Sequence, residues 1–262
     1  MNDLDHSTPL AEDSLSQKYP TAGIKITTCS QAKRQVTEYK FRTAEVLSRA
    51  FRTDPVIRFL TSSLSDEAHN AYLESYMHTL VKAAILNDAK LEEAEGWQCV
   101  AVWMPPRKRV DNIATIVPAG FIPVVARLGL GGAKAFMGKR MLWDFQAQSD
   151  KMKKKHLQGI KDYWYLFFIA TEEEARGQGL ATRIIARYQN FAAKDGLPIW
   201  LEATTAHSRD IYLRCGFKQL DQLVMGKGTH ASTGKQERGG SGVKLWPMIW
   251  KPESISKAIN GN

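Results

Sequence analysis

The sequence predicts an α/β fold in which one mixed, twisted sheet is flanked by helices. Between residues 162 and 225, apolar runs of strand length alternate with amphipathic stretches of helical length, and this alternation is typical of α/β proteins. A Gly-rich loop follows the most apolar of these runs and leads directly into a helix. With 262 residues, the chain is long enough for one domain with a sizeable core.

The N-terminal part begins with a polar, acidic stretch over residues 1–22, which we expect to be a disordered tail. The hydrophobic periodicity then predicts a short strand and two long helices, at 24–28, 38–52 and 66–86. Asp54-Pro55 ends the first of these helices, because the residue before a proline is disfavoured in the helical region. We expect a single domain over residues 23–262.

The middle of the chain predicts a hairpin followed by a helical insertion. Residues 90–94 and 98–104 flank Glu95-Gly96-Trp97, which has the composition of a tight turn. Residues 110–157 contain prolines and a Gly-rich segment that interrupt any single helix, so we expect two or three helices there.

The C-terminal part gives the clearest pattern. The periodicity predicts two strand–helix pairs, at 162–170, 180–194, 199–203 and 207–214. Gly216 is placed to end the last helix, and two more strands follow at 217–225 and 243–250. Residues 226–242 are rich in Gly, Ser, Thr and Lys, and we expect a flexible connection.

Composition excludes several classes of protein. The net charge is +9, but the basic residues are spread along the chain and are not interleaved with aromatic residues as in nucleic-acid modules. The three cysteines have neither disulfide-framework nor metal-ligand spacing, which favours a reducing, cytoplasmic location. We find no signal peptide and no apolar run long enough to span a membrane. We therefore expect no nucleic acid, membrane or metal partner.

The Gly-rich loop from Arg176 to Ala181 predicts a phosphate site. Glycines between a strand and a helix let the backbone approach a ligand closely, and the helix N-terminus offers free N–H groups and a positive dipole end. The loop lacks the G-x-G-x-x-G pattern of dinucleotide-binding folds and the Gly-Lys-Ser/Thr of a P-loop. An ordinary left-handed turn before a helix is the alternative interpretation.

Taken together, the Arg-x-x-Gly-x-Ala loop, the strand Trp200-Leu-Glu-Ala203 and the segment Tyr212-Leu-Arg-Cys-Gly-Phe217 resemble the GNAT superfamily of acyl-CoA-dependent N-acyltransferases. The resemblance is strongest over residues 162–225. Features such as Val100-Ala-Val-Trp-Met-Pro105 bring the whole chain closer to the puromycin N-acetyltransferase-like branch. This resemblance implies a sheet that is splayed where coenzyme A binds.

The resemblance also implies which residues hold acetyl-CoA. Those we expect to do so are Ile169, Ala170, Arg176, Gly177, Gln178, Gly179, Leu180, Ala181, Thr182, Arg183 and Ser208. Ser208 stands where many family members have an asparagine, and capping its own helix is the alternative role. Arg183 and Arg187 lie one helical turn apart, so they either meet the 3′-phosphate of coenzyme A or form a solvated face.

Two residues carry the expected chemistry. Tyr212 matches the family tyrosine that protonates the departing thiolate, since a phenol has a suitable pKa; simple packing is the alternative. Glu202 lies on an otherwise apolar strand, and burial is expected to raise its pKa toward neutrality and make it the general base. Glu202 acting only to orient a helix or to bind the substrate ammonium is an equal alternative.

The acceptor pocket is less well defined by the sequence. Asp54 and Trp103 are candidate substrate-binding residues, with a helix-ending turn and core packing as their respective alternatives. The 110–157 segment is interpreted as a lid over this pocket.

The predicted function is acetyl-CoA-dependent N-acetylation of the primary amine of a small molecule, such as an antibiotic, toxin or metabolite, with a role in detoxification or resistance. The protein is expected to be a monomer or homodimer. Acetylation of a protein or peptide amine, and a catalytically silent CoA-binding regulator, are the alternatives.

Overall fold

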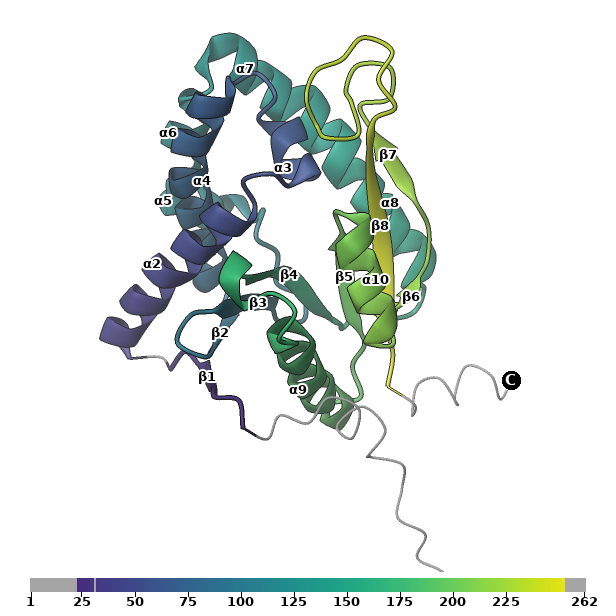
Figure 1. Ribbon diagram of the computed structural model, residues 1–262. Helices are drawn as coiled ribbons and strands as arrows, with labels where there is room; N and C mark the ends of the chain where they lie inside the picture. The colour runs from purple at the N-terminus through teal and green to yellow at the C-terminus, as the bar shows by residue number, and fades with distance from the viewer. Residues whose placement is uncertain (1–22, 31, 253–262) are drawn as a thin grey trace, which may run out of the picture.

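An eight-stranded mixed sheet forms the centre of the computed structural model, which describes residues 23–30 and 32–252 (Figure 1). The strand order is β1-β2-β3-β4-β5-β8-β6, and β7 also pairs with β8. The strands are β1 (Ile26–Thr28), β2 (Lys90–Ala94), β3 (Cys99–Met104), β4 (Trp164–Thr171), β5 (Ile199–Ala203), β6 (Lys218–Gln219), β7 (Leu223–Met225) and β8 (Val243–Trp250). The predicted α/β class is confirmed. The expected tail at 1–22 lies outside the described residues.

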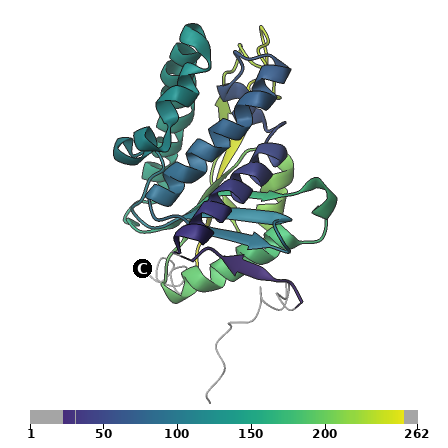
Figure 2. The same ribbon diagram turned by 90° about the vertical axis from the view of Figure 1, so that its left-hand side faces the viewer.

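Helices cover both faces of this sheet, as the two views in Figures 1 and 2 show. They are α2 (Lys33–Ala50), α3 (Pro55–Leu60), α4 (Asp66–Leu86), α5 (Ile113–Ala119), α6 (Phe121–Ala126), α7 (Gly129–Ala135), the π-helix η1 (Phe136–Gln146), α8 (Ala147–His156), the 3₁₀ turn η2 (Glu173–Ala175), α9 (Leu180–Lys194) and α10 (Ala206–Arg214). One core cluster packs α2, α3, α4 and the 113–157 helices on one face, and a second packs α9 and α10 on the other.

The sheet opens between its two central strands. β4 and β5 are parallel and pair through Trp164–Ile199 and Tyr165–Trp200, near the start of each strand. In the described residues no further pairing between them follows, although β4 runs on to Thr171 and β5 to Ala203. The backbone groups of the later half of β4 that face β5 therefore lack a strand partner. The splay that the family resemblance implied is present.

A β-bulge in β4 lies close to this opening. Val102 of β3 pairs with Phe168 and the next residue, Trp103, pairs with Leu166, so Phe167 is the extra residue. Because the bulge shifts the alternation of side chains by one residue, both Phe167 and Phe168 pack with the core cluster of α2 and α4. Leu166 belongs to the opposite cluster.

Three expectations from the sequence need correction. The 110–157 segment contains five helical elements, α5 to α8 and η1, because Pro118, Gly120 and Gly129 divide the chain into short pieces. The strand expected at 217–225 is divided into β6 and β7, which both pair with β8. In chain order, Asp54 begins α3 rather than ending α2, which stops at Ala50.

The 226–242 segment is a structured loop, contrary to the expected flexible connection. Its backbone makes internal hydrogen bonds, such as His230 N to Gly226 O at 2.9 Å. The buried ring of His230 packs edge-on against Phe59 of α3 at 4.7 Å, and its Nε2 is 2.9 Å from Ser62 Oγ. A composition rich in glycine predicted flexibility here, but packing on α3 gives the loop a fixed path.

Candidate active site

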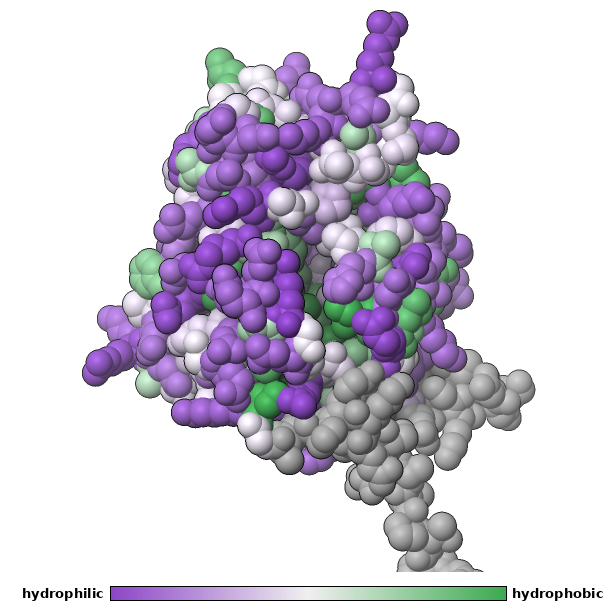
Figure 3. Space-filling view, in the orientation of Figure 1, coloured by the Kyte–Doolittle hydropathy of each residue, from purple (hydrophilic) through white to green (hydrophobic). Residues whose placement is uncertain are grey.

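A cleft of about 630 Å³ lies where β4 and β5 diverge. It is bordered on one side by the start of α9 and by α10, and on the other by the α2–α3 turn, α4 and η1. Figure 3 shows a hollow in the corresponding face of the molecule, with hydrophobic surface along part of its edge. We call the part of the cleft beside α9 and α10 the donor half, and the part beside α2, α3, α4 and η1 the acceptor half. The names follow the acyl-donor and amine-acceptor roles that the family resemblance implies.

The predicted phosphate loop lies in the donor half. Arg176, Gly177 and the segment Gly179–Thr182 line the cleft. Gly177 and Gly179 have φ angles of +81° and +75°, and a Cβ on either would project into open space. Gly179 begins α9 without a side-chain cap, so the first N–H groups of that helix have no intrahelical partner. The open space and free N–H groups fit the diphosphate of an acyl-CoA.

The other helix of the donor half, α10, begins differently. Thr205 and Ser208 form a capping box, with Ser208 N donating to Thr205 Oγ1 at 3.0 Å and Thr205 N donating to Ser208 Oγ at 3.2 Å. Ser208 thus has the capping role that was its alternative, and it also lines the cleft. The contrast leaves α9 as the helix whose N-terminal donors remain available here.

Other predicted coenzyme A residues are divided between the cleft and its surroundings. Ile169 and Ala170 line the cleft on the unpaired part of β4. Gln178 borders a separate, shallower pocket behind the loop, and Arg183 is not among the cleft-lining residues. Arg187 pairs with Glu92 of β2 and donates to Thr28 Oγ1 at 3.1 Å, so it belongs to the sheet edge.

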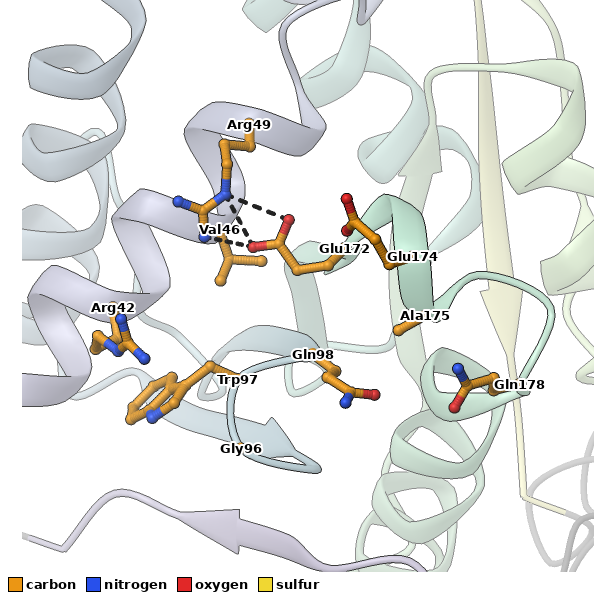
Figure 4. A pocket seen from close by; sticks show the side chains of 10 residues that line it. All are labelled: Arg42, Val46, Arg49, Gly96, Trp97, Gln98, Glu172, Glu174, Ala175 and Gln178. Atoms are coloured by element: carbon orange, nitrogen blue, oxygen red, sulfur yellow. Dashed lines mark hydrogen bonds and ion pairs between the residues drawn. The ribbon is translucent and has the colours of Figure 1, made fainter.

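The smaller pocket lies between α2 and the loop from Arg176 to Ala181, and an ion pair in it links the two (Figure 4). Arg49 of α2 points at Glu172, the residue before η2, and its Nε donates to Glu172 Oε1 at 3.0 Å. Arg49 also donates to Glu45 Oε1 at 2.9 Å. The guanidinium of Arg49 therefore links α2 to the turn that precedes the loop from Arg176 to Ala181.

Tyr212 lies on α10, with its side chain buried and lining the cleft. Burial raises the pKa of its phenol above the ordinary value, and electrostatic interactions with Cys215 and Asp54 raise it further. The phenol therefore keeps its proton throughout the neutral range. A protonated phenol at the junction of the two halves can donate a proton to a leaving group.

Glu202 lies on β5, lines the cleft and has a side chain only 3% exposed. Its Oε1 accepts hydrogen bonds from Ser149 Oγ at 2.6 Å and Trp200 Nε1 at 2.7 Å, and Lys153 Nζ lies 3.5 Å away. Burial raises the pKa of Glu202, but the charge of Lys153 and these hydrogen bonds outweigh burial and lower it. The expected rise toward neutrality is wrong, because α8 supplies a cation and a hydroxyl.

Asp54 is the second carboxylate of the cleft. Its Oδ1 accepts from Val56 N and Ile57 N at 2.9 and 3.0 Å, and its Oδ2 accepts from Thr204 Oγ1 at 2.5 Å. Burial raises the pKa of Asp54, and these hydrogen bonds only partly oppose that rise. Asp54 is thus both a helix cap and a cleft residue, the two roles that the sequence left open.

Trp103 does not line the cleft, which corrects its candidate role in substrate binding. The indole is fully buried in the cluster beneath α9, where it stacks on Tyr188 with ring centroids 3.9 Å apart. Its Nε1 donates to Glu92 Oε2 at 3.0 Å. Trp103 shares one face of β3 with Cys99 and Ala101 by the ordinary alternation of a strand, and this face packs beneath α9 rather than lining the cleft.

Sequence reasoning missed most of the acceptor half. Ser149 and Lys153 come from α8, within the segment interpreted as a lid, and no motif marks them. The bulge that turns Phe168 toward this half also has no local sequence signal. The aromatic run of β4 is visible in the sequence, but the sequence does not show which of its rings line the cleft.

Comparisons with known proteins agree with this geometry. Residues 136–217 match the model of the Acetyltransferase (GNAT) family. An uncharacterized N-acetyltransferase of Schizosaccharomyces pombe is 26% identical over 228 residues, which cover 87% of this chain and 85% of that protein.

Two solved structures share the fold. A histone acetyltransferase HPA2 and related acetyltransferase of Corynebacterium glutamicum gives a TM-score of 0.52 at 19% identity, covering 87% of this chain and 96% of that one. Arylalkylamine N-acetyltransferase 2 of Aedes aegypti gives 0.53 at 17% identity, covering 87% and 99%. The sheet and its flanking helices therefore form a GNAT-type fold. The family match and the N-acetyltransferase relative support an enzyme of the GNAT acetyltransferase type.

Two features are absent from the part of the chain that the structure describes. None of the helices there is long and apolar enough to cross a membrane. No group of three or more His, Cys, Asp or Glu side chains in the same part of the chain is arranged to hold a metal ion.

Proposed function

We propose that this chain is an acetyl-CoA-dependent N-acetyltransferase that acetylates the primary amine of a small molecule by direct attack within a ternary complex. The observation that carries this proposal is that basic groups border one half of a single cleft and carboxyl groups border the other half. Arg176, Arg214 and the uncapped start of α9 border the donor half, whereas the two acids of the cleft, Asp54 and Glu202, border the acceptor half. An anionic donor and a cationic acceptor fit these halves respectively.

Acetyl-CoA, when bound, supplies an acetyl group in a thioester. The N–H groups of the segment Gly179–Thr182 and of Gly177 are the groups we assign to its diphosphate. The unpaired backbone of β4 near Ile169 is assigned to the thioester carbonyl, whose oxygen gains negative charge during attack. Ala170 borders the same stretch of the cleft.

In the proposed reaction the amine nitrogen forms a bond to the acetyl carbon, and the carbon–sulfur bond breaks. Tyr212 gives its proton to the departing sulfur. The ammonium form of the acceptor must first lose a proton, because only a neutral amine has the lone pair needed for attack. The buried phenol is then restored from solvent or from the proton released by the amine.

We assign the two carboxylates different tasks. The lowered pKa of Glu202 keeps it ionised at neutral pH, which suits a residue that binds the acceptor ammonium. The raised pKa of Asp54 brings it closer to neutrality, which suits a proton acceptor. Asp54 contacts Thr204, two residues after Glu202 on β5, so the two acids flank the same stretch of the cleft.

The finer parts of the proposal rest on narrower support. The segments Ala50–Pro55, Val100–Pro105 and Gly242–Met248 support the puromycin N-acetyltransferase-like branch, and with it a role in detoxification of or resistance to a toxic amine. Three free cysteines support a cytoplasmic location.

The test is release of free thiol from acetyl-CoA in the presence of a panel of amines, with mass detection of the acetylated product. We expect turnover with small primary amines. Turnover with peptides alone would favour the protein acetyltransferase alternative, and tight binding of coenzyme A without turnover of any acceptor would favour a regulator.

A further inference from the structure

The acceptor half of the cleft combines an aromatic wall with two carboxyl groups, those of Asp54 and Glu202. Resting on the proposed function, we propose that the acceptor is a monoamine with an apolar body, preferably aromatic, rather than a polyamine. The wall selects the body of the acceptor, and the carboxylates select a single ammonium group.

The aromatic wall is built by the β4 bulge. Tyr165, Phe167 and Phe168 all line the cleft and all pack with the cluster of α2 and α4. The rings of Phe167 and Phe168 lie 4.1 Å apart, and those of Tyr165 and Phe167 lie 5.9 Å apart. A regular strand would turn alternate residues away, so the bulge places an additional ring in the acceptor half.

Other elements complete this wall. Phe51, just after α2, packs edge-on against Phe168 with ring centroids 5.2 Å apart. Tyr76 of α4 and Phe145 of η1 also line the cleft, together with aliphatic residues of α3. Pockets of this composition bind ligands that bring apolar surface to be buried.

The charged groups leave room for one ammonium. Asp54 already accepts three hydrogen bonds from the protein. Glu202 Oε1 is occupied by Ser149, Trp200 and Lys153. Its buried Oε2 makes no hydrogen bond of ordinary geometry among the described residues, although the phenol of Tyr165 lies close enough to help lower the pKa of this carboxyl. A buried carboxylate oxygen without a well-aligned donor is unfavourable, and one N–H group of the acceptor would satisfy it.

The ammonium group of Lys153 already lies beside Glu202 in the acceptor half. Its Nζ lies 4.5 Å from the centroid of the Tyr165 ring, as well as 3.5 Å from Glu202 Oε1. A second ammonium on the acceptor would have to compete for Asp54, which is assigned to take the proton of the reacting amine, or stay unpaired among aromatic side chains. Both options are costly for a charge that leaves water.

The test compares amines that differ in one terminal group. We expect kcat/KM for hexylamine to exceed that for 1,6-diaminohexane by about tenfold or more, and 2-phenylethylamine to be at least as good as hexylamine. In the Lys153→Met enzyme the preference for hexylamine over the diamine should shrink, because a repelling charge is gone. Lys154→Met, which changes the exposed neighbour on α8, should leave the preference unchanged.

The outcomes separate this inference from the function on which it rests. Equal or better turnover of the diamine by the unmodified enzyme would overturn the inference and leave the acetyltransferase proposal intact. A preference unchanged in Lys153→Met, or changed equally in Lys154→Met, would overturn the role given to Lys153. No turnover of any amine by an enzyme that binds coenzyme A would overturn both.

Discussion

The two halves of the cleft are built in opposite ways. The donor half comes from one continuous stretch of chain, in which β4, the Gly-rich loop and α9 follow one another. The acceptor half is assembled from residues as far apart in sequence as Phe51 and Leu245. The difference teaches that a backbone-based site can be encoded locally, whereas a side-chain pocket here depends on the tertiary fold.

The donor half is tested most severely by Gly179→Val. A branched side chain is strained at a φ of +75° and would fill the open space at the start of α9. We expect binding of acetyl-CoA to fall by about 100-fold or more, measured by titration calorimetry. Gly196→Val is the matched control. Gly196 also has a positive φ of +63° and open space around it, but it lies just beyond the C-terminal end of α9, at the opposite end of the helix from Gly179. Equal loss in both variants would mean a folding defect.

Where the two halves meet, Tyr212→Phe removes the proposed acid. We expect kcat to fall by about 100-fold while KM for acetyl-CoA changes little. Tyr188→Phe is a suitable control, because this buried phenol of α9 does not line the cleft. An unchanged kcat in Tyr212→Phe would remove it from the reaction.

In the acceptor half, pH separates the two carboxylates. A base must be ionised, so the rate falls as the pH drops through its pKa; for Asp54 that fall lies above the ordinary aspartate range, because its pKa is raised. Asp54→Asn should remove this acidic limb of kcat/KM and lower the rate by about 100-fold. Glu202→Gln should keep the limb and raise KM for the amine about tenfold.

The same amine is used with the unmodified enzyme and both variants, so the ionisation of the amine affects all three pH profiles of kcat/KM equally. If Glu202→Gln abolishes the acidic limb and Asp54→Asn preserves it, the roles proposed for the two acids are reversed.

The smallest effect is expected behind the donor half. Arg49→Gln breaks the ion pair with Glu172 that holds the phosphate loop. Because Arg49 is 44% exposed, the pair contributes only about 0.2–1 kcal/mol, and we expect a two- to fivefold rise in KM for acetyl-CoA with kcat unchanged. Arg42→Gln, on the same helix but not linked to Glu172, should have no effect. A fall in kcat instead would mean that Arg49 influences the acceptor half as well.

The donor half could be predicted from sequence because its signals are short-range. The periodicity predicted α9 at 180–194 and β5 at 199–203, and the structure confirms both ranges. The roles of Gly177 and Gly179 follow from a turn that only the backbone between one strand and one helix defines. In the same way, the 66–86 helix and the 243–250 strand are confirmed because each has a long, uninterrupted pattern.

The acceptor half could not be predicted, for physical reasons that particular residues show. The pKa of Glu202 depends on Lys153, which is 49 residues distant along the chain but 3.5 Å away in space. Trp103 is buried because Tyr188 of α9, which lies far along the chain, stacks on its ring. The path of residues 226–242 depends on packing against α3, which glycine content alone does not reveal.

The contact of Lys153 and Ser149 with Glu202 has a consequence for protein engineering. A shortened enzyme without the 110–157 segment would retain a carboxylate under the sheet that had lost its compensating charge and its hydroxyl donor. Such a deletion therefore calls for an uncharged residue in place of Glu202, as well as polar residues on the core face that the 113–157 helices cover. The same constraint applies when the 110–157 segment is exchanged between related chains. The segment should be transferred together with β5, so that Ser149 and Lys153 keep their contacts with Glu202.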